Sequence, residues 1–225
     1  MSVEDVKALF TQFLTSPKLK EVGKIISKRL GRKLEAYDIW YDGFKPRSNL
    51  DETKLDSQIQ KLYPNAEAFK AGLPSLLTHL GFTPERANEI CDKIAVDAAR
   101  GSGHAWGAAM KGQQSHLRTR IPAEGMNYKG YNIAVHEFGH NVEQTISMYN
   151  VDNFMMAGVP NTAFTEALAF VFQKRDLQLL GIENNDPEKD KMDILDKFWS
   201  LYEIMGVSML DISIWEWLYA NPNAT

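Results

Sequence analysis

The sequence predicts a mainly α-helical protein with one small antiparallel β-sheet, and three observations support this fold class. Apolar residues recur at helical spacing along most of the chain, and capping residues stand where these stretches begin and end. After Gly101 the pattern changes to short segments with few helix signals. No repeat or long linker interrupts the chain, so we place only a soft boundary between a helical front portion (1–100) and a mixed core (101–225).

The first two helices are predicted from their capping residues. Ser2 with Asp5 forms a capping-box pattern ahead of an apolar stripe. Ser16 followed by Pro17 is typical of the start of a second helix, and Gly31 of its end. Each signal depends only on neighbours in the chain, so we expect both helices to begin and end close to these positions.

The rest of the front portion contains three further predicted segments. Residues 34–46 read as an extended segment followed by a turn. Residues from about 50 to 80 are expected to be helical, with a break or kink at Pro74. A helix is expected from Thr83 to Gly101, with the single cysteine, Cys91, on its apolar stripe as a small buried residue.

The mixed core is predicted to alternate between strands and helices. Two short segments separated by the turn-like KGQQ read as neighbouring antiparallel strands. Three helices should follow, and the first of them carries the sequence HEFGH. The expected ranges are strands at 102–110 and 115–122, and helices at 130–148, at 162–180 and from Asp186 onward.

Charge and composition exclude several classes of partner and location. The net charge is only −4 and the 25 lysines and arginines are scattered, so we expect neither nucleic acid nor an anionic membrane as a partner. One cysteine cannot form an internal disulfide. The sequence shows no signal peptide and no apolar run of membrane-spanning length, which favours a cytoplasmic location if the N-terminus is native.

The stretch HEFGH carries the strongest chemical signal in the chain. On a helix, His136 and His140 share one face and lie about 6 Å apart along the axis. Two imidazoles at that spacing can bind one zinc ion at about 2.0–2.1 Å. Glu137 adjoins the first histidine and can act as a base on the zinc-bound water rather than as a ligand. The alternative is a histidine pair that only packs on a helix face.

A third protein ligand is needed, and the sequence offers few positions for it. A metzincin would require glycine at position 143 and histidine at position 146, but this chain has Glu143 and Ile146. The metzincin class is therefore excluded. Glu143 also lies about 10 Å from His136 along the helix axis. Glu166 lies near the start of the next predicted helix, and antiparallel packing would bring it to the metal, leaving a position open for water. Alternatively, Glu166 is only a first-turn acid stabilised by the helix dipole.

These residues resemble a known family of enzymes. HEFGH, with an apolar-aromatic lead-in and a later helix glutamate, resembles the thimet oligopeptidase and oligoendopeptidase group of zinc peptidases, of the gluzincin type. The segments SGHAWGA and HLRTRIP resemble the sheet ahead of the motif in that family, and the likeness covers roughly residues 100–220. It implies a zincin-like core, cleavage of short peptides in a deep channel, Glu137 as base, and one zinc held by His136, His140 and Glu166.

The chain departs from that family in two respects. Glu143 stands where the family often has another histidine, and the chain ends before the tyrosine and histidine that steady the oxyanion in such enzymes. We therefore expect a catalytic-domain fragment. Tyr128, Tyr131 and Tyr149 could supply a hydroxyl, but packing is the expected role of each.

The motif and the resemblance together predict a zinc-dependent metallopeptidase that cleaves short peptides by attack of a zinc-bound water. His104 and His116 flank the predicted sheet and are candidates for contact with the peptide substrate, although histidines on short strands more often serve packing. The strands at 102–107 and 115–121 could also bind a peptide backbone by strand addition. Two alternatives stay open: a zinc carboxypeptidase with the same ligands, and a zinc-binding fragment without activity.

Overall fold

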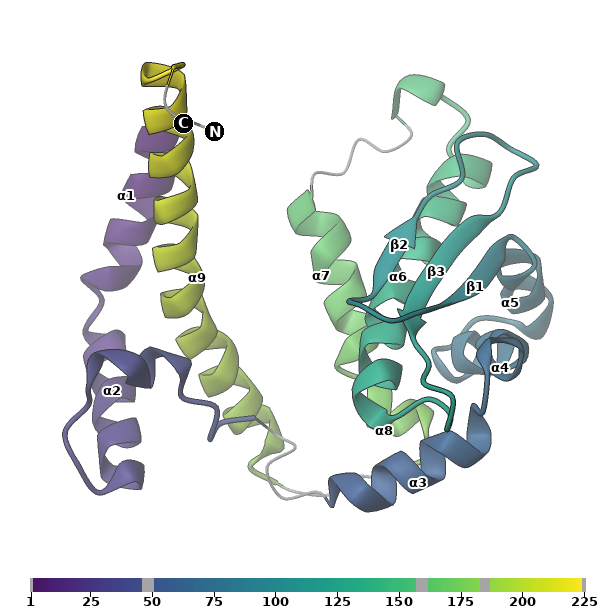
Figure 1. Ribbon diagram of the computed structural model, residues 1–225, viewed down its shortest axis with the longest axis horizontal. Coiled ribbons are helices and arrows are strands. Elements are labelled where there is room, and N and C mark those ends of the chain that lie inside the picture. Colours follow the sequence, from purple (N-terminus) through teal and green to yellow (C-terminus); the bar gives the residue numbers. More distant parts are fainter. Residues whose placement is uncertain (1, 46–50, 157–161, 183–186, 224–225) are drawn as a thin grey trace. The chain divides into compact units, whose positions relative to one another are not determined.

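The computed structural model describes residues 2–45, 51–156, 162–182 and 187–223. These residues form mainly helices and one three-stranded sheet (Figure 1), which confirms the predominance of helix. The chain divides into two compact units: unit 1 joins Met1–Asn49 to Asn185–Thr225, and unit 2 comprises Leu50–Asn184. The boundary expected near residue 100 falls inside unit 2.

Unit 1 is helical, and its first helices begin where their capping residues predict. It contains α1 (Val3–Leu14), α2 (Pro17–Leu30), the 3-10 helix η1 (Ala36–Trp40) and α9 (Lys189–Ala220). The Ser2 hydroxyl accepts the Asp5 N–H at 3.1 Å, and the Asp5 carboxylate accepts the Ser2 N–H at 3.0 Å. Ser16 caps α2, and Gly31 ends it in the left-handed conformation with φ 68°.

The extended segment expected at 34–46 is wrong in its first part, which forms η1 instead. A buried carboxylate explains this local folding. Asp38 accepts the Glu35 N–H at 2.6 Å and binds the Arg32 guanidinium through two contacts of 2.7 Å each. These bonds hold the pKa of Asp38 below its ordinary value, with the Arg32 hydrogen bonds as the largest cause.

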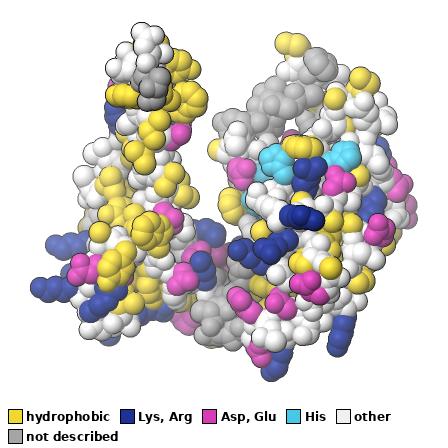
Figure 2. All heavy atoms as spheres, viewed as in Figure 1, with side chains coloured by type: hydrophobic (Ala, Val, Ile, Leu, Met, Phe, Trp, Pro, Cys, Tyr) yellow, Lys and Arg dark blue, Asp and Glu magenta, His cyan; other side chains and the backbone are white. Residues whose placement is uncertain are grey.

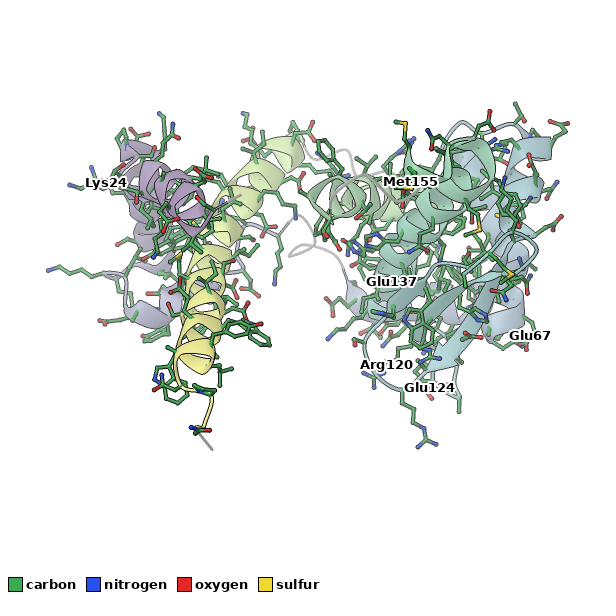
Figure 3. The ribbon with its side chains drawn as sticks, turned by 90° about the horizontal axis from the view of Figure 1, so that it is seen from above. Lys24, Glu67, Arg120, Glu124, Glu137 and Met155 are labelled. Carbon is green, nitrogen blue, oxygen red and sulfur yellow. The ribbon has the colours of Figure 1, made fainter. Side chains whose placement is uncertain are left out.

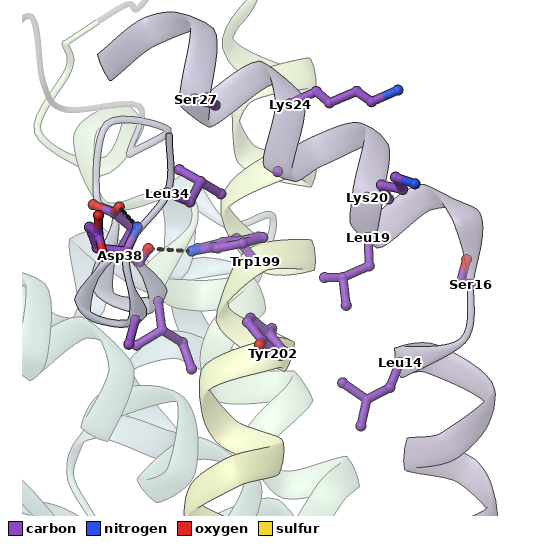
Figure 4. Close-up of a pocket in the computed structure, with 14 residues that line it drawn as sticks. Leu14, Ser16, Leu19, Lys20, Lys24, Ser27, Leu34, Asp38, Trp199 and Tyr202 are labelled. Carbon is purple, nitrogen blue, oxygen red and sulfur yellow. Dashed lines mark hydrogen bonds between the residues drawn. The ribbon is translucent and has the colours of Figure 1, made fainter. Parts of the chain in front are cut away.

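The core of unit 1 is small, and a pocket lies beside it. Its buried residues are Val22, Ile26, Phe44 and Trp199. The indole N–H of Trp199 donates to the Asp38 carbonyl at 3.2 Å, which ties α9 to η1 (Figure 4). The pocket has a volume of about 490 Å³, and its apolar lining includes Leu14, Leu19, Leu34 and Trp199.

The last helix of unit 1 leaves much of its apolar surface exposed. The helix expected from Asp186 begins at Lys189, while Asp186 itself lies outside the described residues. Trp199 is buried, but Trp215 and Trp217 are 53% and 55% exposed. None of the helices in the described residues combines the length and apolar character that crossing a membrane requires.

Unit 2 contains the sheet and the remaining helices. They are α3 (Glu52–Leu62), α4 (Ala66–His79), α5 (Pro84–Cys91), β1 (Ile94–Ala99), β2 (His104–Trp106), β3 (Ser115–Arg120), α6 (Tyr128–Asn150), η2 (Phe154–Met156), α7 (Thr162–Gln173) and α8 (Asp176–Leu179). A break or kink was expected at Pro74; the break is wrong, because Pro74 lies inside α4, and the kink stays a prediction. The break falls before Asn65, whose side chain caps α4 by accepting the Ala68 N–H at 2.8 Å.

The sheet is mixed rather than antiparallel, with strand order β1-β3-β2. The expected antiparallel pair is present as β2 and β3. The added strand, β1, pairs with β3 in parallel and takes residues that were predicted to continue the helix from Thr83. That helix ends at Cys91. Ile94 is buried at the start of the strand and Val96 packs against the core, so tertiary burial overrides the helical preference of the alanines beside them.

Helix α6 lies against one face of the sheet and α7 packs on α6 (Figure 1). Alternate residues of β3 face α6: Leu117 is fully buried, and the Thr119 hydroxyl donates to the Gly130 carbonyl of α6 at 2.9 Å. The two helices run antiparallel, since His140 meets Glu166 while Asn132 meets Gln173 further along. This confirms the predicted packing of the motif helix against the next one, but the helix predicted at 162–180 ends at Gln173, and the separate short helix α8 follows it.

Candidate metal centre

The HEFGH stretch occupies the middle of α6, between the sheet and α7. The helix begins at Asn127, whose side chain accepts the Gly130 N–H at 2.8 Å. Its apolar residues are fully buried at Tyr131, Ala134, Val135 and Phe138. The apolar face fixes how α6 is rotated. The two histidines of the motif therefore lie next to that face, on the part of α6 that faces α7.

Gly139 allows α7 to come close to the motif. A Cβ atom on this residue would lie 2.8 Å from the Ala169 Cα and 3.2 Å from the Phe172 Cγ. Real Cβ atoms essentially never approach a backbone atom so closely. The glycine therefore sets the distance between the two helices, and this distance places Glu166 opposite the two histidines.

His136, His140 and Glu166 converge as the sequence predicts. The Nε2 atoms of the two histidines are 3.2 Å apart, and Glu166 lies 3.3 Å from His136 and 3.4 Å from His140 through its two oxygens. Neighbouring ligands of a tetrahedral zinc with bonds of about 2.0–2.1 Å lie about 3.4 Å apart. Among the described residues these three form a potential metal-binding group, and Glu143 is not part of it.

The surroundings of His140 favour its neutral imidazole. The side chains of His136 and His140 are only 16% and 14% exposed, whereas that of Glu166 is 42% exposed. Burial lowers the pKa of His140; the nearby Glu166 carboxylate opposes this effect and the His136 charge adds to it. A metal needs the unprotonated imidazole, so this shift suits a ligand.

Glu137 lies beside this group on α6 (Figure 3) and is half buried. Burial raises the pKa of Glu137; the His136 charge opposes the rise and the Glu166 charge adds to it. The chain approaches Glu137 closely at Gly103, where a Cβ would lie 3.1 Å from the Glu137 Oε1 and 2.2 Å from the Ile133 Cγ2. The Glu137 carboxylate therefore lies against the residue just before β2, and the charges of His136 and Glu166 both act on it.

A polar network behind His136 was not predicted from the sequence. The His136 Nδ1 lies 3.1 Å from the Gln173 Oε1, and the Gln173 amide donates to the Asn132 Oδ1 at 2.8 Å. Asn132 donates in turn to Asp176. The sequence did contain one indication of this network. Asn132 precedes His136 by four residues, so it lies on the same helix face as the two histidines, in a part of the helix that is otherwise apolar.

His104 on β2 and His116 on β3 are exposed. Burial is the largest cause of the lowered His140 pKa, and the His104 charge adds a small part to it. Figure 2 shows histidines at the surface of unit 2 beside basic and apolar side chains. The His116 Nδ1 is 2.8 Å from the Asp97 carboxylate on the neighbouring strand, and the His104 ring lies 5.6 Å from the Trp106 ring. Neither histidine joins the group of three on α6 and α7, so their role in binding substrate stays a prediction.

The tyrosines of α6 are held by other groups. The Tyr128 hydroxyl donates to the Asp176 carboxylate at 2.7 Å, and the Tyr131 hydroxyl donates to the Asp176 carbonyl at 3.2 Å. The Tyr149 hydroxyl accepts the Gly112 N–H at 2.8 Å. Tyr128 and Tyr131 are buried, which agrees with the packing role expected for them.

Comparison of the chain with protein-family models, with curated proteins and with solved structures gave no match. The chemistry of the site must therefore be inferred from its own residues. Two imidazoles and one carboxylate form a donor set that suits zinc, and a second carboxylate, Glu137, lies next to this set.

Proposed function

We propose that the protein is a zinc-dependent metallopeptidase with a zincin-like core, related to the oligopeptidase family that its motif resembles. The convergence of His136, His140 and Glu166 carries this proposal, because residues from two helices place their ligand atoms 3.2–3.4 Å apart. The lone pairs of the two histidine Nε2 atoms and the Glu166 oxygens repel one another at that spacing unless a proton or a cation lies between them. A bound cation is the simplest reason for such an arrangement.

The donor set also indicates a catalytic rather than a purely structural metal site. Structural zinc sites usually have four protein ligands, whereas catalytic sites have three and leave a position open. The group on α6 and α7 supplies three, and the Glu166 side chain is 42% exposed, so solvent reaches the site. When bound there, zinc supplies a Lewis acid and lowers the pKa of a coordinated water.

Glu137 is the residue to which we assign proton transfer. A carboxylate with a raised pKa is better matched to accepting a proton from water near neutral pH than an ordinary glutamate. It would take the proton of the attacking water and deliver it to the leaving amine of the peptide. Gly103, the residue just before the edge strand β2, lies next to Glu137, so an extended peptide added to that edge would lie near this carboxylate.

Metal analysis and turnover test the proposal together. We expect about one zinc per purified chain, and near-complete loss in His136→Ala and in His140→Ala. His79→Ala is the matched control, because His79 is an exposed histidine on α4. Full zinc content in either motif variant would overturn the metal site.

Quenched-fluorescence peptides with free and blocked C-termini then separate the possible activities. Cleavage within blocked peptides supports an endopeptidase. Removal of single C-terminal residues only would identify a carboxypeptidase with the same ligands. Stoichiometric zinc without turnover of any peptide would leave a zinc-binding protein and refute the enzymatic part of the proposal.

A further inference from the structure

We propose that Gln173 is a positioning residue that fixes which ring nitrogen of His136 faces the metal-binding group. This inference rests on the proposed zinc site but concerns residues that do not touch the metal. His136 directs Nε2 toward Glu166 and His140, and its other nitrogen, Nδ1, lies 3.1 Å from the Gln173 Oε1. A neutral imidazole has one N–H and one lone pair, so the partner of Nδ1 decides the state of Nε2.

The direction of the network is set at its far end by Asp176. This carboxylate is buried, with 6% of the residue exposed. It accepts the Tyr128 hydroxyl at 2.7 Å, the Leu177 N–H at 2.6 Å and the Asn132 amide N–H at 2.5 Å. An ionised carboxylate can only accept hydrogen bonds. The Asn132 side chain must therefore turn its nitrogen toward Asp176 and its oxygen away.

The orientation of the Asn132 amide determines that of the Gln173 amide, which in turn determines the protonated nitrogen of His136. The outward oxygen of Asn132 accepts the Gln173 N–H at 2.8 Å, so the Gln173 nitrogen faces Asn132. The Gln173 oxygen consequently faces His136. Because an amide oxygen only accepts, the His136 Nδ1 must carry the proton, and Nε2 is left with the lone pair that a metal binds.

The elements of unit 2 build this amide relay from both helices. Asn132 and His136 are four residues apart on α6, Gln173 is the last residue of α7, and Asp176 begins α8. Asn132 is 7% exposed, so water cannot readily replace its partners. The relay therefore preorganises His136 before any metal arrives.

Zinc affinity with matched substitutions tests the relay. Gln173→Met removes the acceptor at similar size, and we expect zinc binding to weaken about 10–100-fold, as for other partners of metal-binding histidines. Gln173→Glu keeps an acceptor and should remain within a few-fold of wild type. Gln178→Met is the control, because Gln178 lies exposed on α8 and its side chain accepts the Arg175 Nε–H at 2.9 Å, away from His136. A competing chromophoric chelator gives each affinity.

Nitrogen-15 spectra of the metal-free protein supply a signature that general destabilisation would not give. Long-range ¹H–¹⁵N correlations distinguish Nδ1–H from Nε2–H in a neutral imidazole. We expect His136 to be Nδ1–H in wild type and in Gln173→Glu, and to shift toward Nε2–H in Gln173→Met. Asp176→Asn changes the far end without touching His136, and we expect the same shift because the Asn132 amide can then turn over.

The outcomes separate this inference from the proposed function. Wild-type affinity together with an unchanged tautomer in Gln173→Met would overturn the relay, as would Nε2–H in the wild-type protein. If Gln173→Met does not fold, Asp176→Asn decides in the same way. If the wild-type protein binds no zinc, the proposed function fails, and the tautomer spectra still confirm or refute the relay.

Discussion

At the scale of single residues, the two glutamates near the histidines differ in what they can do. Glu166 contacts both imidazoles at 3.3 and 3.4 Å, whereas Glu137 is not part of the converging group. If Glu137 is the base, Glu137→Gln should lower kcat about 10²–10⁴-fold while leaving zinc affinity nearly unchanged. Steady-state turnover and chelator competition on the same preparation measure both quantities. Parallel loss of zinc and turnover would instead assign Glu137 to the metal.

Glu143 provides a prediction about stability that does not depend on metal. Burial raises its pKa above the ordinary 4.5, so the folded state holds this proton more tightly than the unfolded state does. The protonated Glu143 carboxyl therefore contributes to the free energy of unfolding. This contribution is complete below a pH of about 4.5 and is lost as the pH rises through the folded-state pKa. Glu143→Gln should therefore raise the Tm at pH 7 and leave it unchanged near pH 4.

Thermal unfolding at the two pH values, in the presence of chelator, provides the measurement. Glu124→Gln serves as the control, because Glu124 is exposed outside the helices of unit 2. An equal rise in Tm for Glu143→Gln at both pH values would show that packing, rather than ionisation of the buried carboxylate, causes the effect.

At the scale of elements, the α6–α7 contact depends on Gly139. A methyl group there would meet the Ala169 backbone at 2.8 Å, and a backbone atom cannot move aside as a side chain can. Gly139→Ala should lower the free energy of unfolding by about 1–3 kcal/mol and weaken zinc binding, since the helices must separate. Gly206→Ala is the control: nothing lies within 4 Å of its Cβ position on α9, so alanine should stabilise that helix.

Denaturant unfolding and zinc titration of both variants measure this pair of effects. A Gly139→Ala protein that is destabilised yet binds zinc like the wild type would show that Glu166 can follow the histidines when α7 moves. In that case the glycine would serve packing alone, and the geometry of the site would be less rigid than the close contact indicates.

The elements that were predicted correctly are those whose signals are local. Ser2, Ser16 and Gly31 define helix ends through bonds to near neighbours, and they do so in the structure. The strand β1 was missed because IAVDAA is rich in alanine, a good helix former, and only pairing with the distant β3 makes it a strand. Pro74 was expected to break or kink a helix, but α4 continues through it, and Asn65 with its cap sets the boundary instead.

The candidate site divides in the same way. His136, Glu137 and His140 follow from spacing within one helix, and Glu166 follows from antiparallel packing of adjacent helices. Asn132, Gln173 and Asp176 could not be predicted, since their hydrogen bonds join α6 to residues 41 and 44 positions away. Side-chain amides also occur on most helix surfaces, so only the three-dimensional arrangement distinguishes these residues.

At the scale of the whole molecule, the proposed metal site belongs to one unit only. The three proposed ligands and Glu137 lie within Leu50–Asn184, and so does the amide relay. Unit 1 is assembled from both ends of the chain and has a separate core around Trp199. A ligand stabilises the part of a protein whose unfolding destroys its binding site. Zinc should therefore act on the two units differently.

We expect zinc to protect the amides of α6 and α7 from hydrogen exchange and to leave those of α2 and α9 unchanged. With free zinc at about 1,000 times its Kd, the added protection should approach about 4 kcal/mol for amides that exchange only when the site unfolds. His140→Ala, which lacks a ligand, is the control and should show no zinc effect in either unit. Equal zinc protection of both units in the wild type would mean that they unfold as one cooperative body, because the stabilisation would then extend to residues that take no part in the site.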